Sequence, residues 1–225
     1  MNPPRSNKEA LVLVAHADDE TIGCGGYLPL LASRGWRVTV IIASCGRFRR
    51  GEDEVDNRTA ALEAGKILRA RSVRFLDLED QRFEQYGTRD ITERIENLNL
   101  NPRLILTHSA EDLNRDHRVM HEIALLYARP SSRRANILAC EIPNNAEYRG
   151  GAFRANFFVD ITRTLRLKQR AFACYVHEIR PFPHPYSAEG LEIKAKQRGM
   201  EAGVPFAEAY QVVRWFDCEG GGHAE

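Results

Sequence analysis

Near its start the chain reads Leu11-Val12-Leu13-Val14-Ala15-His16-Ala17-Asp18-Asp19-Glu20. The first five residues are all apolar, a pattern typical of a buried strand. An imidazole and three carboxylates follow directly on one loop, and so much charge is costly to bury without a compensating partner. Histidine and carboxylate together form a ligand set for zinc and similar divalent metals. The alternative is a polar loop whose carboxylates cap the next helix.

The composition is ordinary for a single globular domain. A chain of 225 residues can bury one substantial core. The formal net charge of +1 favours neither nucleic acid nor an anionic membrane as a partner. No apolar run has the length of a transmembrane helix, and residues 1–9 contain no signal-peptide core. The five cysteines form no CxxC pair, which argues against a disulfide framework and a thiolate zinc site. We expect a cytoplasmic protein with a small-molecule substrate; homo-oligomerisation stays open.

Strand-like and helix-like segments alternate along the first two thirds of the chain. Strands are predicted at residues 11–15, 38–43, 73–76, 104–107 and 137–142, with helices at 21–34, 54–69, 91–98 and 119–127. The last third adds a strand at 157–161 and helices at 164–175 and 188–202. This alternation predicts an α/β fold: a Rossmann-like, mostly parallel sheet with helices on both faces. We expect a single domain over residues 1–219 and a disordered tail at 220–225.

A second polar loop, residues 108–118, follows the predicted fourth strand. Sites in parallel sheets gather in loops at the carboxyl ends of the strands, so this loop can lie beside His16. His117 is then a candidate third ligand that complements His16 and Asp19. Asp116 is either a helix cap or an acceptor that orients a metal-bound imidazole. His121 completes an H-x-x-x-H pattern without the glutamate of metalloproteases, so we expect it to be structural.

In these two loops the chain resembles the PIG-L/LmbE-like N-acetylglucosaminyl deacetylase superfamily. Members of that superfamily are zinc-dependent hydrolases that remove acyl groups from amino sugars. The segment His16-Ala17-Asp18-Asp19-Glu20 is similar to the His-Pro-Asp-Asp-Glu signature of that family. Further matches extend to about Arg214: Gly23-Cys24-Gly25-Gly26, Arg58, residues 112–118, Phe158-Val159-Asp160-Ile161, Pro181-Phe182-Pro183-His184-Pro185, and Gly203 with Ala207-Glu208-Ala209.

The resemblance implies that His16, Asp19 and His117 ligate Zn²⁺ and that Asp18 is the general base. Zinc lowers the pKa of bound water from 15.7 to roughly 7, which supplies a nucleophile at neutral pH. A carboxylate that is not a ligand can accept a proton and pass it to the departing amine. The implied reaction is hydrolysis of the acyl group, acetyl in the first instance, from the amide nitrogen of an amino sugar or sugar conjugate.

The chain departs from the family pattern at two positions. Ala17 replaces the usual proline, and Asn114 stands where many members have the first histidine of a His-x-Asp-His motif, thought to stabilise the oxyanion. Asparagine can donate a hydrogen bond but cannot act as an acid. We therefore take both Asn114 and His184, which lies in a stiff proline-flanked loop, as candidate catalytic residues. The alternative for His184 is packing within a proline-rich turn.

Three further residues are candidate substrate contacts. Asp80 and Arg82 follow the third predicted strand, so their loop faces the same edge of the sheet. Arg58 could bind a phosphate or carboxylate of the substrate, or form an ion pair on its own helix.

Two other classes of function remain as alternatives. One is a non-catalytic sugar- or nucleotide-binding Rossmann-type module, although Gly23-Cys24-Gly25-Gly26 lacks the G-x-G-x-x-G spacing and the acids before it would repel a pyrophosphate. The other is a metal phosphohydrolase, which would need further acidic ligands for a second metal, such as Asp112 and Asp116.

Overall fold

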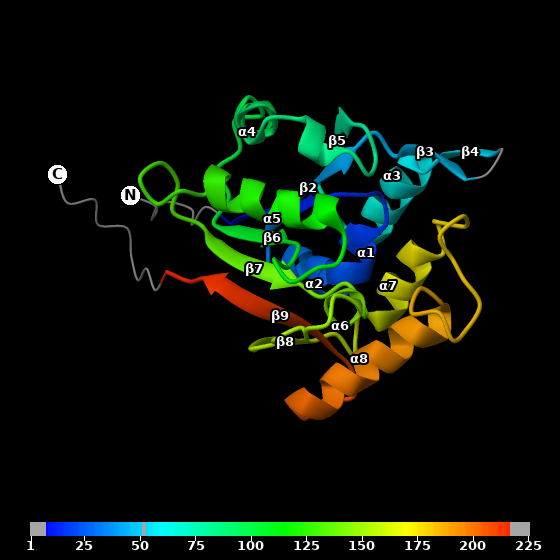
Figure 1. The fold of residues 1–225 in the computed structure, drawn as a ribbon. Helices are drawn as coiled ribbons and strands as arrows, with labels where there is room; N and C mark the ends of the chain where they lie inside the picture. Colours follow the sequence, from blue (N-terminus) through cyan, green and yellow to red (C-terminus); the bar gives the residue numbers. More distant parts are fainter. Residues whose placement is uncertain (1–7, 51–52, 217–225) are drawn as a thin grey trace.

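A computed structural model of the chain describes residues 8–50 and 53–216, so the predicted tail at 220–225 lies outside the described residues. Seven strands form the main sheet in the order β5-β2-β1-β6-β7-β9-β8 (Figure 1). Their bounds are β1 Glu9–Val14, β2 Arg37–Ser44, β5 Ser72–Leu78, β6 Leu104–Thr107, β7 Asn136–Cys140, β8 Phe157–Asp160 and β9 Ala207–Arg214. Strands β5, β2, β1, β6 and β7 are parallel, which confirms the predicted α/β class.

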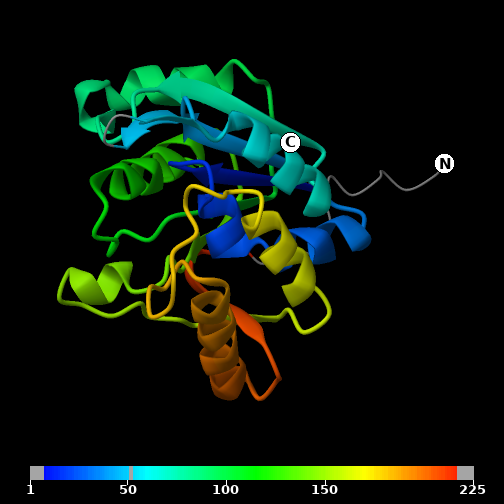
Figure 2. The ribbon, with the colours of Figure 1, turned by 90° about the vertical axis from the view of Figure 1, so that its right-hand side faces the viewer.

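Helices cover both faces of this sheet, as the sequence predicts. One face carries α1 Asp19–Cys24, α2 Tyr27–Ser33, α3 Arg58–Ile67, α7 Leu165–Phe172 and α8 Ala188–Ala202, and the other carries α4 Thr88–Glu96 and α5 Arg115–Tyr127. Figure 2 shows α5 on one side of the sheet and α3 and α7 on the other. Strand β1 supplies both cores: Val12 and Val14 pack under α1 and α2, whereas Leu11 and Leu13 pack under α4 and α5. This alternation follows from the two-residue period of a strand.

Three features differ from the sequence prediction. Strand β9 was not predicted; it pairs antiparallel with β7 and β8 and extends the sheet. The predicted helix at 54–69 is wrong at its start, where β4 (Asp53–Asp56) pairs with β3 (Arg47–Arg50) in a separate hairpin. The predicted helix at 21–34 is divided into α1 and α2. A Cβ at Gly26, which lies at this junction, would come within 2.6 Å of Ile161 Cγ2.

The remaining short elements are the 3-10 turn η1 (Phe83–Gln85) and helix α6 (Asn145–Tyr148). Among the described residues, no helix combines the length and apolar character needed to cross a bilayer.

Candidate active site

A polar cavity of about 600 Å³ lies at the carboxyl ends of the parallel strands. Its floor comes from the loops after β1 and β6, and the segment 173–187 between α7 and α8 forms part of its wall. Figure 2 looks onto this edge, with that segment in gold crossing in front of the strand ends. The two loops that the sequence singled out therefore meet at one edge of the sheet.

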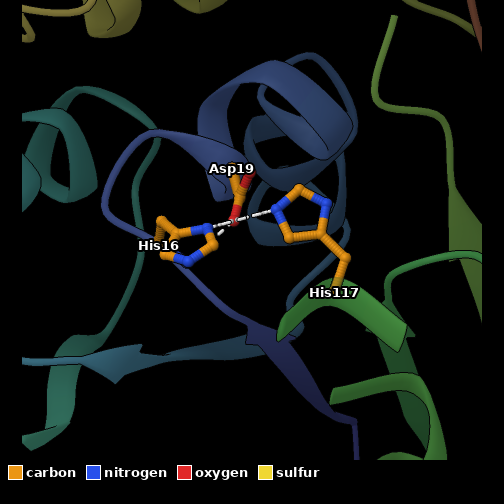
Figure 3. Close-up of side chains that lie close together, drawn as sticks. All are labelled: His16, Asp19 and His117. Atoms are coloured by element: carbon orange, nitrogen blue, oxygen red, sulfur yellow. Dashed lines mark hydrogen bonds and ion pairs between the residues drawn. The ribbon is translucent and has the colours of Figure 1, made fainter. Parts of the chain in front are cut away.

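Three side chains converge at the base of the cavity (Figure 3). His16 Nδ1 lies 3.1 Å from His117 Nε2 and 3.4 Å from Asp19 Oδ2, and His117 Nε2 lies 3.3 Å from Asp19 Oδ2. Metal–ligand bonds of about 2.1 Å in a tetrahedron place the ligand atoms roughly 3.4 Å apart. The three donor atoms therefore have the spacing of three corners of such a tetrahedron, and their types suit a divalent metal.

Carboxylates contact the outer nitrogen of each imidazole. His117 Nδ1 lies 2.9 Å from Asp112 Oδ2, and His16 Nε2 lies 3.0 Å from Asp116 Oδ2 and 2.9 Å from Asp80 Oδ1. Such partners fix the ring orientation and raise the basicity of a metal-ligating histidine. Asp116 was predicted to be either a helix cap or an acceptor that orients an imidazole, and its contact fits the second of these roles. That imidazole belongs to His16, whereas His117 is oriented by Asp112.

His108 is a neighbour of this cluster that sequence reasoning missed. Its Nε2 accepts a hydrogen bond from the amide of Ala15 at 2.9 Å and lies 3.3 Å from Asp19 Oδ2, and its ring stacks on that of His117. Burial lowers the pKa of His108, so the ring is neutral. The sequence signal that could have identified His108 is its position directly after β6, where site residues of a parallel sheet gather. His121, by contrast, contacts the carbonyl of His108 at 2.8 Å and is structural, as expected.

The electrostatic environment favours a cation among these residues. Burial alone would lower the pKa of His117, but the charge of Asp19 and the bond to Asp112 raise it to about 9. Burial likewise opposes the charge of His16, yet its bonds to Asp116 and Asp19 raise its pKa well above the ordinary value. The carboxylates thus favour positive charge at this point, and a divalent metal would supply it while displacing the protons.

Asp18 projects from the same loop in a strained backbone conformation, with a φ of 143°. Non-glycine residues rarely adopt positive φ, and functional sites are where such strain concentrates. The amide of Asp18 donates to Glu20 Oε2 at 3.2 Å, and Glu20 in turn accepts a bond from Tyr175 at 2.5 Å. Burial raises the pKa of Asp18 well above its ordinary value, and the charge of Asp19 adds to the effect. Asp18 is therefore a buried carboxylate that lines the cavity without belonging to the ligand cluster.

The two candidates for the oxyanion role lie in different places. Asn114 lines the cavity and caps α5, because its Oδ1 accepts a bond from the amide of Asp116 at 2.9 Å. Its side-chain NH₂ is thus the group that it can offer to a ligand. His184 is exposed and is not among the residues that line the cavity. Its Nδ1 accepts a bond from the amide of Tyr186 at 3.0 Å, so the structure does not bring His184 into the site.

Of the three predicted substrate contacts, only Asp80 lines the cavity. The guanidinium of Arg58 pairs with Asp77, while Arg82 lies 3.1 Å from Glu79 on an exposed surface. The partner of Arg58 lies on β5, so the expected ion pair within its own helix is not the one observed. Neither arginine is among the residues that line the cavity.

Other cavity residues were not identified from the sequence as candidates. Glu178 lines the wall and accepts a bond from Asn57 Nδ2 at 2.9 Å, so the segment 173–187 is joined to the start of α3. Arg47 and Arg115 also line the cavity. A charged residue in a loop gives no local signal of where the loop folds back, so only the tertiary structure identifies these groups.

The family profile of PIG-L, described as GlcNAc-PI de-N-acetylase, matches residues 11–128, which is just over half of the chain. The chain belongs to the PIG-L family. The matched region contains the three cluster residues and Asp18, and the predicted family is confirmed. Among proteins of curated function, no match was found.

Solved structures share the fold over nearly the whole length of this PIG-L member. GalB, the 4-carboxy-2-hydroxymuconate hydratase from Pseudomonas putida, is 26% identical, with a TM-score of 0.75 over 96% of this chain and 100% of that chain. The N,N'-diacetylchitobiose deacetylase from Pyrococcus horikoshii is 19% identical, with a TM-score of 0.71 over 95% and 86% of the two chains. A deacetylase of the teicoplanin biosynthesis pathway is 17% identical, with a TM-score of 0.73 over 93% and 100%.

Proposed function

We propose that this PIG-L protein is a metal-dependent hydrolase that removes an acyl group, acetyl in the first instance, from the amide nitrogen of an amino sugar or sugar conjugate. The observation that carries the proposal is the tetrahedral spacing of His16 Nδ1, Asp19 Oδ2 and His117 Nε2 beside a separate buried carboxylate. The family description, GlcNAc-PI de-N-acetylase, supports the reaction type. The ion we propose is Zn²⁺, because zinc binds well to imidazole nitrogens and carboxylate oxygens.

In this proposal His16, Asp19 and His117 hold the metal, which would polarise the acyl carbonyl and lower the pKa of a water molecule. Asp18 accepts a proton from the attacking water and delivers it to the amide nitrogen as the carbon–nitrogen bond breaks. The water oxygen ends in the released carboxylic acid and the sugar keeps a free amine. Asp112 and Asp116 keep the two imidazoles in place during this exchange.

The cavity wall is suited to a hydroxylated substrate. Asp80 and Glu178 carry carboxylates, which accept hydrogen bonds from sugar hydroxyl groups. A substrate with several carboxylates would be repelled by the same groups. The two cavity arginines compensate weakly, because Arg47 is paired with Asp56 at 2.8 Å and both arginine side chains are exposed at the cavity mouth.

A second candidate is hydration, the addition of water to a carbon–carbon double bond. It is favoured by one observation: GalB, a hydratase, is 26% identical over nearly the full length of both chains. The ligand cluster and a general base would serve either reaction. The products differ, since hydrolysis releases an amine and a carboxylic acid, whereas hydration releases no fragment.

The test is an amine-release screen across N-acyl amino sugars with the zinc-loaded full chain and with an Asp18→Asn variant. We expect the wild-type protein to release amine and Asp18→Asn to bind zinc normally while losing at least 100-fold in turnover, as general bases contribute about 10²–10⁴-fold. Glu122→Gln, on the exposed face of α5, is the control for a change of charge. Normal hydrolysis by Asp18→Asn would refute its role as base, and hydration of a muconate without amine release would favour the second candidate.

A further inference from the structure

The group that would donate a hydrogen bond to the oxyanion is unassigned in this chain, because the chain departs from the family pattern at that position. Asn114 replaces the usual histidine, and its Oδ1 is already engaged by the amide of Asp116. His184 is exposed and points its Nδ1 at the backbone of its own loop. A developing oxyanion is normally met by more than one preorganised donor. Another side chain of the cavity therefore has to be considered.

Tyr186 lies two residues after His184 and does line the cavity. Its backbone is fixed on both sides, because its amide donates to His184 Nδ1 at 3.0 Å and its carbonyl accepts from the amide of Arg180 at 3.1 Å. The ring of Tyr186 also meets the ring of His184 edge-on, with a centroid distance of 5.3 Å. The tyrosine thus enters the cavity from a braced turn, and the contacts of His184 are part of that brace.

The hydroxyl of Tyr186 is an unused donor. The buried Tyr175 and Tyr210 give their hydroxyl hydrogens to Glu20 and Glu208, whereas Tyr186 is half-buried. No such bond is made by the hydroxyl of Tyr186 within the described part of the chain. A phenol with an ordinary pKa of about 10 keeps its proton at neutral pH. Burial, followed by the charges of the nearby Asp18 and Asp19, raises the pKa of Tyr186 well above this value, so the hydrogen stays available.

We infer that Tyr186 is a catalytic residue whose hydroxyl donates a hydrogen bond to the acyl oxygen as negative charge develops there. This inference rests on the proposed hydrolase function, and it assigns to Tyr186 the role that sequence reasoning gave to His184. No bond to Tyr186 forms or breaks in the step; the hydroxyl keeps its proton throughout. The side-chain NH₂ of Asn114, which also lines the cavity, is the second donor.

The experiment compares three variants of the zinc-loaded full chain on the N-acyl sugar that the amine-release screen identifies. Tyr186→Phe removes only the hydroxyl. We expect kcat to fall about 100–1,000-fold, as for loss of one oxyanion donor, with KM changed less than about threefold. Zinc content and the urea midpoint of unfolding should stay at wild-type values. Tyr148→Phe, at an exposed tyrosine on α6, is the matched control and should leave kcat unchanged. His184→Ala should lower kcat far less than Tyr186→Phe.

The outcomes separate this inference from the proposed function. Amine release at equal rates by wild type and Tyr186→Phe would overturn the inference and leave the hydrolase function intact. A raised KM with unchanged kcat would also overturn it, because a donor used only in binding affects substrate and transition state alike. Loss of turnover in His184→Ala but not in Tyr186→Phe would return the role to His184. Absence of amine release by the wild type would remove the proposed function and this inference together.

Discussion

Single carboxylates behind the cluster decide how firmly its imidazoles are held. Asp112 Oδ2 lies 2.9 Å from His117 Nδ1, while Asp112 Oδ1 accepts the amide of Asn114 at 2.8 Å. Asp112→Asn keeps an oxygen for that amide and removes the charge facing the ring. We expect zinc affinity to fall about 10–100-fold, the usual cost of losing a partner behind a ligating histidine. Competition with a chromogenic chelator measures this.

The control for this prediction is Glu122→Gln, which removes a carboxylate from the exposed face of α5, the helix that carries His117. Its zinc affinity should equal that of the wild type. An Asp112→Asn protein that binds zinc as tightly as the control would show that the contact with His117 does not tune the metal.

Sequence reasoning reached the ligand cluster at the residue scale because strand ends in a parallel sheet meet at one edge. His16 and Asp19 follow β1 directly and His117 opens the helix after β6, so two local patterns sufficed. The structure leaves His184 exposed and outside the cavity lining, which the sequence did not indicate. Proline fixes a loop without revealing which side chain points inward, and here the inward residue is Tyr186.

At the scale of elements, a buried ion pair joins α7 to β9, and its carboxylate also caps α2. Lys168 Nζ on α7 lies 2.7 Å from Glu208 Oε1 on β9, and both side chains are buried. Glu208 also accepts the amides of Gly26 and Tyr27 at 2.7 and 2.8 Å, and so caps α2 from across the fold. One carboxylate therefore ties together three elements that are distant in the sequence.

We expect Glu208→Gln to lower the free energy of unfolding by about 3–5 kcal/mol, because it leaves the buried ammonium of Lys168 without its counter-charge. Urea denaturation measures the loss. A double variant with Lys168→Met should recover part of it, since no buried charge then remains. Glu63→Gln, which removes the exposed partner of Lys66, is the control and should cost less than about 1 kcal/mol. A loss for Glu208→Gln no larger than for the control would contradict the prediction.

The elements missed from the sequence show where local patterns stop being informative. In the β3–β4 hairpin, Arg47 is in register with Asp56, and Arg47 Nε lies 2.8 Å from Asp56 Oδ2. A strand with so much charge has no apolar alternation to reveal it, and opposite charges across strands supply the pairing preference instead. Strand β9 lies between β7 and β8, and its long-range pairing with both is contained in no short window of sequence.

For the whole molecule, the proposed metal site joins two segments that are 101 residues apart, since His16 follows β1 and His117 lies in α5. The two apolar cores on either face of the sheet contain none of the three ligands. The fold should therefore persist without metal, while a bound metal stabilises it by mass action.

We predict that chelator-treated protein keeps its far-UV circular dichroism and loses thermal stability. Free zinc at 100 times its dissociation constant adds about 2.7 kcal/mol, which for a chain of this size corresponds to a rise in Tm of roughly 5–10 °C. Zinc add-back, followed by calorimetry, measures the rise. Asp19→Asn is the matched control. In the present chain the amide of His16 donates to Asp19 Oδ2 at 2.7 Å, and asparagine keeps an oxygen for that amide while it removes the charge of the ligand. The Tm of this variant should therefore not respond to zinc. An equal zinc-dependent rise in the Tm of Asp19→Asn would place the ion elsewhere on the molecule. Zinc stabilises only a protein that binds it, so an unchanged rise would mean that the zinc site does not include Asp19.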